Sequence, residues 1–224
     1  MNIYGYNIEL EKKNIKNINM YIRSDGSIKI TAPHRVKDKE IEAFVFAHLD
    51  WLEKNTKRVA EKSEKHSPKR LLSDGDTLCL WGKGYTVKTM LKKRFSIEIE
   101  GETATVTYRE NSTDEQRIKH LTEWYRAQLE IEAQVYFSKW ESVTGLSCSS
   151  FQIRDMKTRW GSCNTKTKRI LLSLRLACLD KSCLDYVVLH ELVHTLIPNH
   201  GAEFKAELTK YMPEWRTIQK EMKH

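Results

Sequence analysis

The stretch that decides the fold of this chain reads His190-Glu191-Leu192-Val193-His194-Thr195-Leu196-Ile197-Pro198-Asn199-His200. Residues four apart on an α-helix lie on one face about one turn apart, so His190 and His194 can aim imidazole nitrogens at one ion. Glu191 then projects beside that ion. Zinc hydrolases combine such a pair with a third protein ligand, an open position for water and a glutamate base. The stretch therefore predicts a zinc-dependent hydrolase.

The sequence around the motif predicts a buried helix. Residues 184–189 are largely apolar, and Leu192, Val193 and Leu196 continue that surface around the histidines. Two histidines on a mostly buried helix are unfavourable unless something binds them. The alternative is a pair of ordinary core or surface histidines.

His200 is the expected third zinc ligand. Pro198 would clash with a continuing helix, so the chain should turn near Ile197 and carry His200 back toward the ion. Glu214 is the main rival, because it follows His194 at a spacing that thermolysin-like enzymes use for a glutamate ligand. A further alternative is that His200 is a solvent-exposed turn residue.

Two strands are expected upstream of the helix, because residues 151–156 and 169–176 both alternate apolar and polar side chains. Gly161-Ser162 and the polar residues 164–168 lie between them and predict a hairpin-like connection. An edge strand beside a metal site can bind an extended peptide through its free backbone groups. One of these strands is a candidate for that role.

Arg159 is a candidate catalytic residue, since a guanidinium offers a planar pair of donors to an oxyanion, a carboxylate or a phosphate. An equally good reading is a structural arginine that holds the connection to the helix. Trp160 is expected to pack in the core. Cys163 is expected to be a small buried side chain, because three histidines and one water already complete a catalytic zinc site.

Four segments in order resemble the YgjP-like family of predicted metal-dependent hydrolases, and more widely SprT-like and WLM zincin domains. They are Thr158-Arg159-Trp160-Gly161-Ser162-Cys163, Leu172-Ser173-Leu174-Arg175-Leu176, Tyr186 to His194, and Asn199-His200-Gly201 with Phe204. The resemblance implies a gluzincin-like metallopeptidase domain with His190, His194 and His200 as zinc ligands and Glu191 as catalytic base. It says less about substrate, because a UTP pyrophosphatase activity is also ascribed to the family.

The fold class expected is α+β, with a β-rich N-terminal domain over residues 1–110 and a zincin-like catalytic domain over residues 111–224. In the first domain, strands are expected at 4–10, 18–23 and 27–31 around an Asp25-Gly26 turn, followed by one helix over 37–62 and a polar linker over 62–70. Residues 77–81, 85–91, 95–100 and 103–108 then predict a β-meander.

The second domain is expected to open with a long support helix from about residue 112, where Ser112-Thr113-Asp114-Glu115 supplies capping residues, to about Thr144. Gly145 should end it. Short antiparallel strands, the metal-site helix and a C-terminal helix complete the order. His120 on the support helix is expected to be an ordinary solvated or core histidine.

The cysteine content and the absence of long hydrophobic runs indicate the cellular compartment expected for this protein. The five cysteines are odd in number and form no CxxC pair, and no hydrophobic run opens the chain. These features predict a reducing, cytoplasmic setting. No stretch approaches the roughly 18 apolar residues of a membrane span. The sequence gives no sign of an oligomeric state.

The net charge of +8 raises the question of phosphate-bearing partners. Thirty acidic residues are interspersed, so direct binding of nucleic acid is an alternative that we do not favour. The leading hypothesis is a zinc metallopeptidase that acts on a protein or peptide. The first alternative is a UTP pyrophosphohydrolase with Lys166, Lys168 and Arg169 on the phosphates. The second is a DNA-proximal or partner-binding module with structural zinc.

Overall fold

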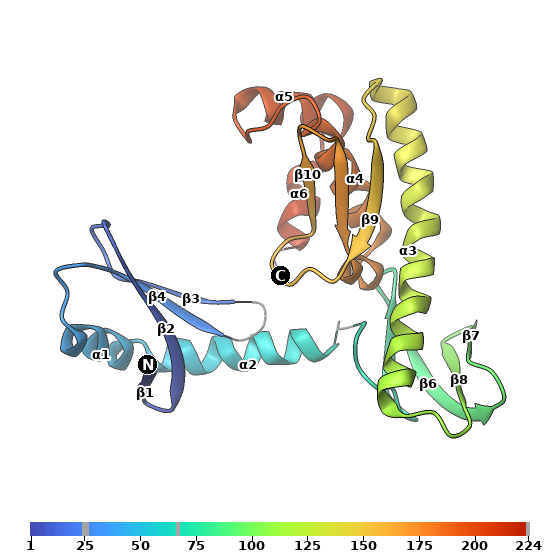
Figure 1. The fold of residues 1–224 in the computed structure, drawn as a ribbon, viewed down its shortest axis with the longest axis horizontal. Coiled ribbons are helices and arrows are strands. Elements are labelled where there is room, and N and C mark those ends of the chain that lie inside the picture. Colours follow the sequence, from blue (N-terminus) through green and yellow to red (C-terminus); the bar gives the residue numbers. More distant parts are fainter. Residues whose placement is uncertain (24–26, 66–67, 223–224) are drawn as a thin grey trace. The chain divides into compact units, whose positions relative to one another are not determined.

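The chain forms two compact units in the computed structural model, Met1–Lys65 and His66–His224 (Figure 1). The structure describes residues 1–23, 27–65 and 68–222, with the side chains of residues 58–65 excluded. The expected Asp25-Gly26 turn lies outside the described residues. Both units mix helices with sheets, so the expected α+β class is confirmed.

The first unit packs one sheet against two helices. Its strand order is β1-β2-β4-β3, with β2 and β4 parallel and the other pairs antiparallel. The alternating pattern of burial places Ile8 and Ile30 against Ile41 and Val45 of the first helix. The bounds are β1 (Asn2–Ile3), β2 (Tyr6–Lys13), β3 (Asn19–Ile22), β4 (Ile28–Pro33), α1 (Asp38–Ala47) and α2 (Leu49–Lys65).

The single helix expected over residues 37–62 is wrong, because the structure has two helices that meet at His48. The backbone of His48 leaves the helical region, with φ −120° and ψ 17°. Its side chain is exposed, and its Nδ1 donates to the Phe44 carbonyl oxygen at 2.8 Å. His48 therefore marks a break within the segment that was expected to be one helix.

The second unit begins with a four-stranded sheet in the order β5-β6-β8-β7. Strands β6 and β8 are parallel, so the expected β-meander, in which every neighbour is antiparallel, is wrong. The apolar residues Ala104, Val106 and Tyr108 place β8 inside the sheet and leave the glutamate-bearing β7 at its edge. The bounds are β5 (Thr77–Leu80), β6 (Lys83–Lys92), β7 (Ser96–Glu100) and β8 (Thr103–Arg109).

The two four-stranded sheets share one topology. In each, a first hairpin is followed by a strand at the far edge and then by a strand that inserts next to the hairpin, parallel to its second strand. Both first hairpins turn through a pair of residues with positive φ, Tyr4-Gly5 and Trp81-Gly82. Such pairs are typical of tight hairpin turns. The chain therefore repeats one β-arrangement, each time followed by helix.

Helix α3 (Asp114–Thr144) confirms the expected support helix. The Thr113 side chain accepts from the Gln116 N–H while the Gln116 side chain accepts from the Thr113 N–H, a reciprocal cap. Gly145 ends the helix in the left-handed region at φ 71°, where a residue without Cβ is favoured.

Three short strands follow and form the sheet beside the metal-site helix, in the order β10-β11-β9. Strands β9 (Ser150–Arg154) and β11 (Arg169–Ser173) are parallel, so the hairpin expected between them is wrong. The hairpin is instead formed by β11 with β10 (Gly161–Asn164), a strand that lies at the edge of this sheet.

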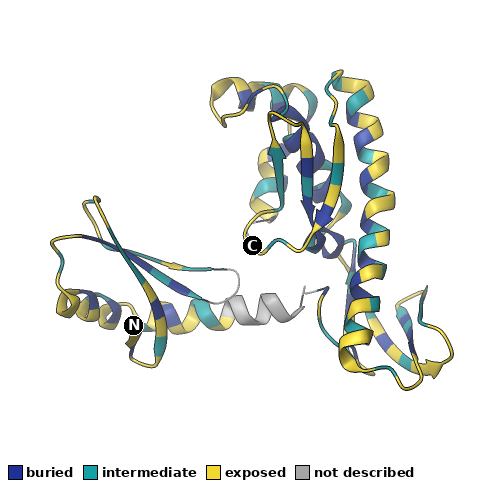
Figure 2. Cartoon of the chain, in the orientation of Figure 1, coloured by how far each residue is buried: buried dark blue, intermediate teal, exposed yellow. Residues whose placement is uncertain are grey.

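The rest of the unit is helical. Helix α4 (Lys181–Val193) carries the motif and is buried along most of its length, as Figure 2 shows. It packs against α3, α5, α6 and β10. No helix in the described part of the chain combines the length and apolar character needed to cross a membrane. The remaining bounds are η1 (Leu174–Cys178), α5 (Ala202–Tyr211) and α6 (Trp215–Glu221), so two helices stand where one C-terminal helix was expected.

The division into compact units differs from the boundary expected at residue 110. Residues of the β5–β8 sheet, such as Leu78 and Val106, share one continuous core with α3 and α4. The turn between β5 and β6 also docks on the segment before α4, where Trp81 N donates to the Ala177 carbonyl oxygen at 2.9 Å. The sheet over residues 77–109 is therefore part of the unit that contains the histidine motif.

Candidate active site

The structure brings His190, His194 and His200 together. The Nε2 atom of His200 lies 3.1 Å from Nε2 of His190 and 3.1 Å from Nε2 of His194. His190 comes from the last turn of α4, His194 caps that helix, and His200 follows the turn through Pro198 that leads into α5. The expected return of the chain at the proline therefore places three imidazole nitrogens around one point.

The orientation of His194 is fixed by the turn that follows the helix. Its Nδ1 lies 3.0 Å from the Ile197 carbonyl oxygen, which can only accept, so Nδ1 carries the proton. The lone pair of His194 then lies on Nε2 and faces the other two histidines.

A tyrosine orients His190 in a similar way. Tyr186 lies one turn earlier on α4, and its hydroxyl is 3.2 Å from Nδ1 of His190. The same hydroxyl accepts from Nε2 of Gln219 on α6 at 3.0 Å. A chain of contacts therefore joins the C-terminal helix to one histidine of the cluster.

Phe204 packs beneath the whole cluster. Its ring centroid lies 4.9 Å from that of His190, 4.5 Å from that of His194 and 4.8 Å from that of His200. The side chain is buried on the first turn of α5. This ring holds the three imidazoles in place from the apolar side.

Burial favours the neutral form of His190 and His194. It lowers the pKa of His190 to about 3, with smaller contributions from His194 and His200. Burial and the neighbouring His200 also lower the pKa of His194, against the opposing effect of the Ile197 carbonyl. Unprotonated imidazoles at neutral pH are ready to bind a cation.

Glu191 is buried beside the cluster. It lines a cavity of about 580 Å³ that the three histidines also line. Burial raises the pKa of its carboxyl to about 8, and the nearby Arg159 lowers it. The carboxylate occupies space that is open because residue 161 is glycine. A Cβ atom at that position would lie 2.5 Å from Oε1 of Glu191 and 2.8 Å from its Cγ.

Arg159 lies exposed at the rim of the cavity, just before β10. Among the residues that the structure describes, none forms a hydrogen bond or ion pair with its guanidinium. A neighbouring arginine, Arg175, makes contacts typical of a structural side chain. Arg175 donates from Nη1 to the Lys157 carbonyl oxygen at 2.9 Å and lies 4.4 Å above the Trp160 ring.

The rival ligands do not join the cluster. In the described part of the chain, the metal-ligating group around this point consists of His190, His194 and His200, and Glu214 lies exposed at the start of α6. Cys163 lines the cavity, but burial and the nearby Glu191 raise the pKa of its thiol to about 11. His120 stacks on Phe95, with the ring centroids 5.3 Å apart.

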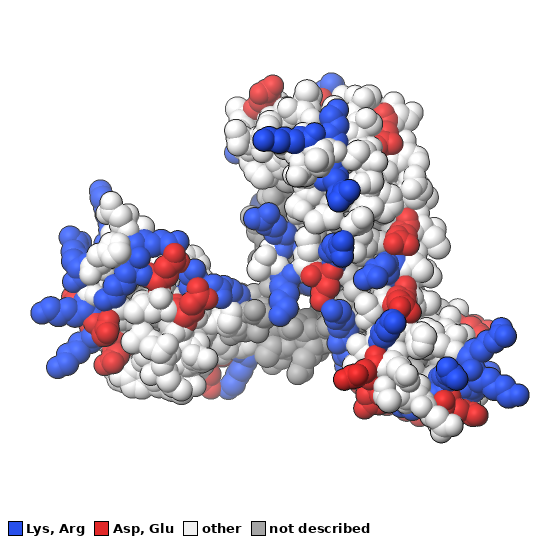
Figure 3. Space-filling model, in the orientation of Figure 1, with Lys and Arg blue, Asp and Glu red and all other residues white. Residues whose placement is uncertain are grey.

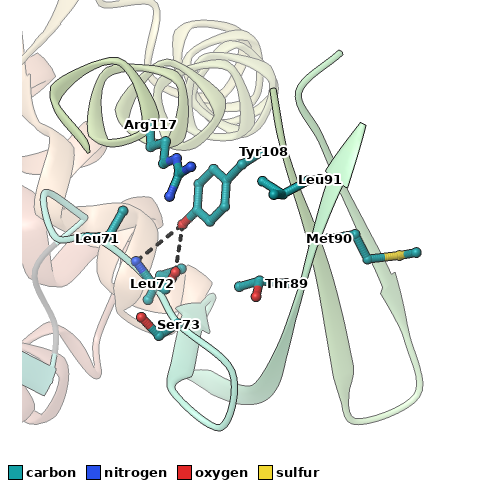
Figure 4. Close-up of a pocket in the computed structure, with 8 residues that line it drawn as sticks. All are labelled: Leu71, Leu72, Ser73, Thr89, Met90, Leu91, Tyr108 and Arg117. Atoms are coloured by element: carbon teal, nitrogen blue, oxygen red, sulfur yellow. Dashed lines mark hydrogen bonds between the residues drawn. The ribbon is translucent and has the colours of Figure 1, made fainter. Parts of the chain in front are cut away.

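A second cavity, of about 260 Å³, lies where residues 71–73 meet strand β6 (Figure 4). Tyr108 lines this cavity. Its hydroxyl donates to the Leu72 carbonyl oxygen at 2.9 Å and accepts from the Leu72 N–H at 3.2 Å. The Arg117 guanidinium lies 5.1 Å from the centre of the Tyr108 ring. These contacts tie the segment before β5 to the sheet and form no metal-ligating group.

Sequence reasoning missed three residues that build the site. Tyr186 precedes His190 by one helical turn, and this spacing was the signal that could have identified it. Gly161 was read as part of a connection rather than as a strand residue that makes room for Glu191. Gln219 lies too far along the chain for any sequence pattern to associate it with the motif.

With this geometry established, comparison with known proteins identifies the family. A model of the YgjP-like metallopeptidase domain matches residues 16–224. The chain belongs to the YgjP-like metallopeptidase family. The resemblance inferred from residues 158–204 is therefore confirmed, and the match extends into the first unit.

The individual proteins that this YgjP-like chain matches are similar to only part of it. It is 37% identical over 65 residues to an uncharacterised protein of Methanocaldococcus jannaschii, a match that covers 28% of this chain and 59% of that protein. It is also similar to the metallopeptidase zymogens of Pyrococcus abyssi abylysin, at 21% identity and a TM-score of 0.37, and of Methanocaldococcus jannaschii jannalysin, at 27% and 0.35. These matches cover 40% and 42% of this chain and 90% and 92% of the other two.

Proposed function

We propose that this protein is a zinc-dependent metallopeptidase in which His190, His194 and His200 hold the ion and Glu191 is the catalytic base. The observation that carries the proposal is the convergence of three Nε2 atoms in one cavity with a buried glutamate. Family membership supports a metal-dependent peptidase, and the chemistry of the residues supports zinc and the role of Glu191.

The three histidines fit zinc. A tetrahedral Zn²⁺ with Zn–N distances of about 2.0–2.1 Å brings its nitrogen ligands to roughly 3.3 Å from one another. The two Nε2–Nε2 distances of 3.1 Å are close to that value. A set of imidazoles suits Zn²⁺, whereas Mg²⁺ prefers carboxylate and water oxygens. Three protein ligands also leave one position open, as in catalytic rather than structural zinc sites.

Glu191 supplies the proton transfers. When bound, Zn²⁺ lowers the pKa of a water molecule and polarises a substrate carbonyl. One carboxylate oxygen of Glu191 accepts a proton from the attacking water and returns it to the nitrogen of the departing amine. The buried position keeps the carboxyl pKa closer to neutrality than that of an exposed glutamate, which suits a group that both accepts and donates.

The free edge of β10 offers a place for an extended peptide. Ser173 N donates to the Trp160 carbonyl oxygen at 2.8 Å, so residue 160 and every second residue after it direct their backbone groups toward β11. Gly161 and Cys163 therefore direct theirs outward, along the cavity that both residues line. A substrate strand that pairs there would pass beside Glu191.

Arg159 is placed to assist. Its exposed guanidinium at the rim is free to bind a developing oxyanion or a carboxylate of the substrate. This proposal keeps Arg159 as a functional residue and assigns the structural role to Arg175.

The test is hydrolysis of a quenched-fluorescent peptide library by the zinc-loaded protein, with UTP hydrolysis measured in parallel. Glu191→Gln should keep its zinc and lose about a thousandfold in peptide cleavage, because proton transfer is removed while the ligands remain. Glu214→Gln, an exposed glutamate, is the matched control. Hydrolysis of UTP alone would favour the pyrophosphohydrolase. Bound zinc with no hydrolysis of either substrate would favour a binding module.

A further inference from the structure

The positive charge of the chain is concentrated beside the proposed active site. Residues 150–175 contain seven basic residues and one acidic residue, a net charge of +6, out of +8 for the whole chain. The acidic residue, Asp155, is already paired with Lys69 at 2.7 Å. Figure 3 shows Lys and Arg side chains gathered over the sheet of β9, β10 and β11. The remainder of the chain is nearly neutral.

The register of this sheet explains why the charge faces outward. Phe151 and Ile153 of β9 lie level with Ile170 and Leu172 of β11, and these four side chains turn toward the core. The opposite face therefore carries the alternate residues. Arg154 and Arg169 are among them, and both are exposed.

The hairpin between β10 and β11 adds two lysines held on an ordered turn. The Asn164 side chain accepts from the backbone N–H groups of Lys166 and Thr167 at 3.1 and 3.0 Å. Lys168 adopts a left-handed backbone conformation, with φ 53°. In the described part of the chain, no acidic side chain pairs with Lys166, Lys168 or Arg169.

Strand β10 connects these charges to the cavity. Arg159, two residues before the strand, and Thr165, just after its end, both line the cavity. Four strand residues span about 13 Å. A peptide paired along this edge would therefore meet Arg159 at one end and the hairpin lysines at the other.

Chemistry on this face favours a polypeptide over nucleic acid. Proteins that bind single-stranded nucleic acid stack bases on exposed aromatic rings. Here the Arg175 guanidinium covers Trp160 at 4.4 Å, and the Phe151 ring stacks on Phe137 in the core, with centroids 4.7 Å apart. The strand edge, in contrast, offers the backbone donors and acceptors that an extended peptide needs.

We infer that Arg169 and the hairpin lysines Lys166 and Lys168, together with Arg159, select substrate segments that carry aspartate or glutamate on both sides of the cleaved bond. The inference rests on the proposed peptidase function. It adds the substrate class, an acidic polypeptide segment in extended conformation.

The experiment compares two fluorescein-labelled peptides of about twelve residues that differ only in carrying glutamate or glutamine at the flanking positions. Binding is followed by fluorescence anisotropy on zinc-loaded Glu191→Gln, which holds substrate without cleaving it. The same measurement is made with Lys166→Gln/Lys168→Gln added. Lys92→Gln/Lys93→Gln, which removes the same charge from the exposed end of β6 and the residue after it, is the matched control.

The glutamate peptide should bind about tenfold more tightly than the glutamine peptide at low salt, because several ion pairs act together. That preference should fall to about twofold in the hairpin variant and persist in the control. Equal affinities for the two peptides, or equal losses in both lysine variants, would overturn the inference. Tighter binding of a single-stranded oligothymidylate through the same lysines would also overturn it, in favour of nucleic acid.

Cleavage by the protein with Glu191 intact separates this inference from the proposed function. If the glutamate preference is found but neither peptide is cleaved, the surface stands and the peptidase proposal fails. If both peptides are cleaved at equal rates, the peptidase proposal stands and the acidic selectivity fails.

Discussion

The carboxylate of Glu191 occupies the space that a side chain at position 161 would need. A Cβ atom on Gly161 would lie 2.5 Å from Oε1 and 2.9 Å from Cδ of Glu191, well inside van der Waals contact. The Glu191 side chain can therefore hold this position because residue 161 is glycine. The proposed base and the proposed substrate-binding edge are built as one unit.

Gly161→Ala should therefore displace the Glu191 carboxylate. We expect peptide cleavage to fall about a hundredfold, the typical effect of misplacing a catalytic group by about 1 Å. Zinc affinity should change little, because residue 161 is not one of the three proposed ligands and the nearest atoms to its added Cβ belong to Glu191. The measurement is kcat/KM on one peptide together with zinc content.

Gly201→Ala is the matched control for this substitution. A Cβ atom there meets nothing within 4 Å, although the residue follows His200 directly. Cleavage should remain close to that of the unmodified protein. An equal loss of activity in both variants would show that the contact between Gly161 and Glu191 is not the cause.

Tyr186→Phe should weaken zinc binding. If Nδ1 of His190 donates to the Tyr186 hydroxyl at 3.2 Å, the lone pair is left on Nε2, where the ion would sit. Removing the hydroxyl should lower zinc affinity about tenfold, measured by competition with a chelating dye. Tyr108→Phe, which loses the hydroxyl drawn in Figure 4, should cost about 1 kcal/mol of stability and leave zinc affinity unchanged. Equal zinc affinity in both variants would show that the Tyr186 hydroxyl does not support the metal site.

The zinc-free protein should lose stability as the pH rises. Burial raises the folded-state pKa of Glu191 from 4.5 to about 8, so the unfolded chain releases its proton first and is favoured increasingly through that interval. Below pH 6.5 the buried His190 acts in the opposite sense, since its folded-state pKa is lowered to about 3. The clean window is therefore pH 6.5 to 8, where Glu191 should contribute a loss of about 2 kcal/mol.

Urea unfolding in the presence of a chelator checks this dependence. Zinc-free Glu191→Gln should show a flatter dependence of the free energy of unfolding on pH than the unmodified chain. Glu214→Gln, whose side chain is exposed, should behave like the unmodified chain. Parallel curves for Glu191→Gln and the unmodified chain would contradict the raised pKa.

The two arginines near Trp160 should respond differently to substitution. Arg175→Gln should lower the melting temperature, because it removes the hydrogen bond to the Lys157 carbonyl oxygen and uncovers the Trp160 ring. Arg159→Gln should leave the melting temperature unchanged, because the side chain is exposed. It should lower kcat/KM about tenfold, because the guanidinium at the cavity rim is proposed to bind the oxyanion or a substrate carboxylate. A fall in stability for Arg159→Gln, with catalysis intact, would return the structural role to Arg159.

Local patterns in the sequence predicted the centre of the site well. The spacing of His190 and His194 on one helix face, and the turn forced by Pro198, are determined within a few residues of the chain. The structure accordingly brings the predicted His200 to the other two. The capping residues of α3, Thr113 and Gly145, were also predicted correctly, because helix caps are determined by residues close in sequence.

Sheet order could not be predicted in this way, because pairing of parallel strands depends on contacts between distant residues. A hairpin was expected where β9 and β11 are parallel, and a meander with β7 between β6 and β8 was expected where β6 and β8 are parallel neighbours. Strand β10 was missed because Gly161-Ser162-Cys163-Asn164 lacks the β-branched and aromatic residues that mark strands. The shared topology of the two larger sheets became visible only from their pairing.

Zinc content of the untagged protein, measured by elemental analysis, tests the central claim most directly. The chain is compared with His200→Ala and with Glu214→Ala, which removes the rival ligand. The account predicts about one zinc per chain in the unmodified protein and in Glu214→Ala, and loss of zinc in His200→Ala. Full zinc in His200→Ala with loss in Glu214→Ala, or no zinc in any sample after incubation with the metal, would contradict it.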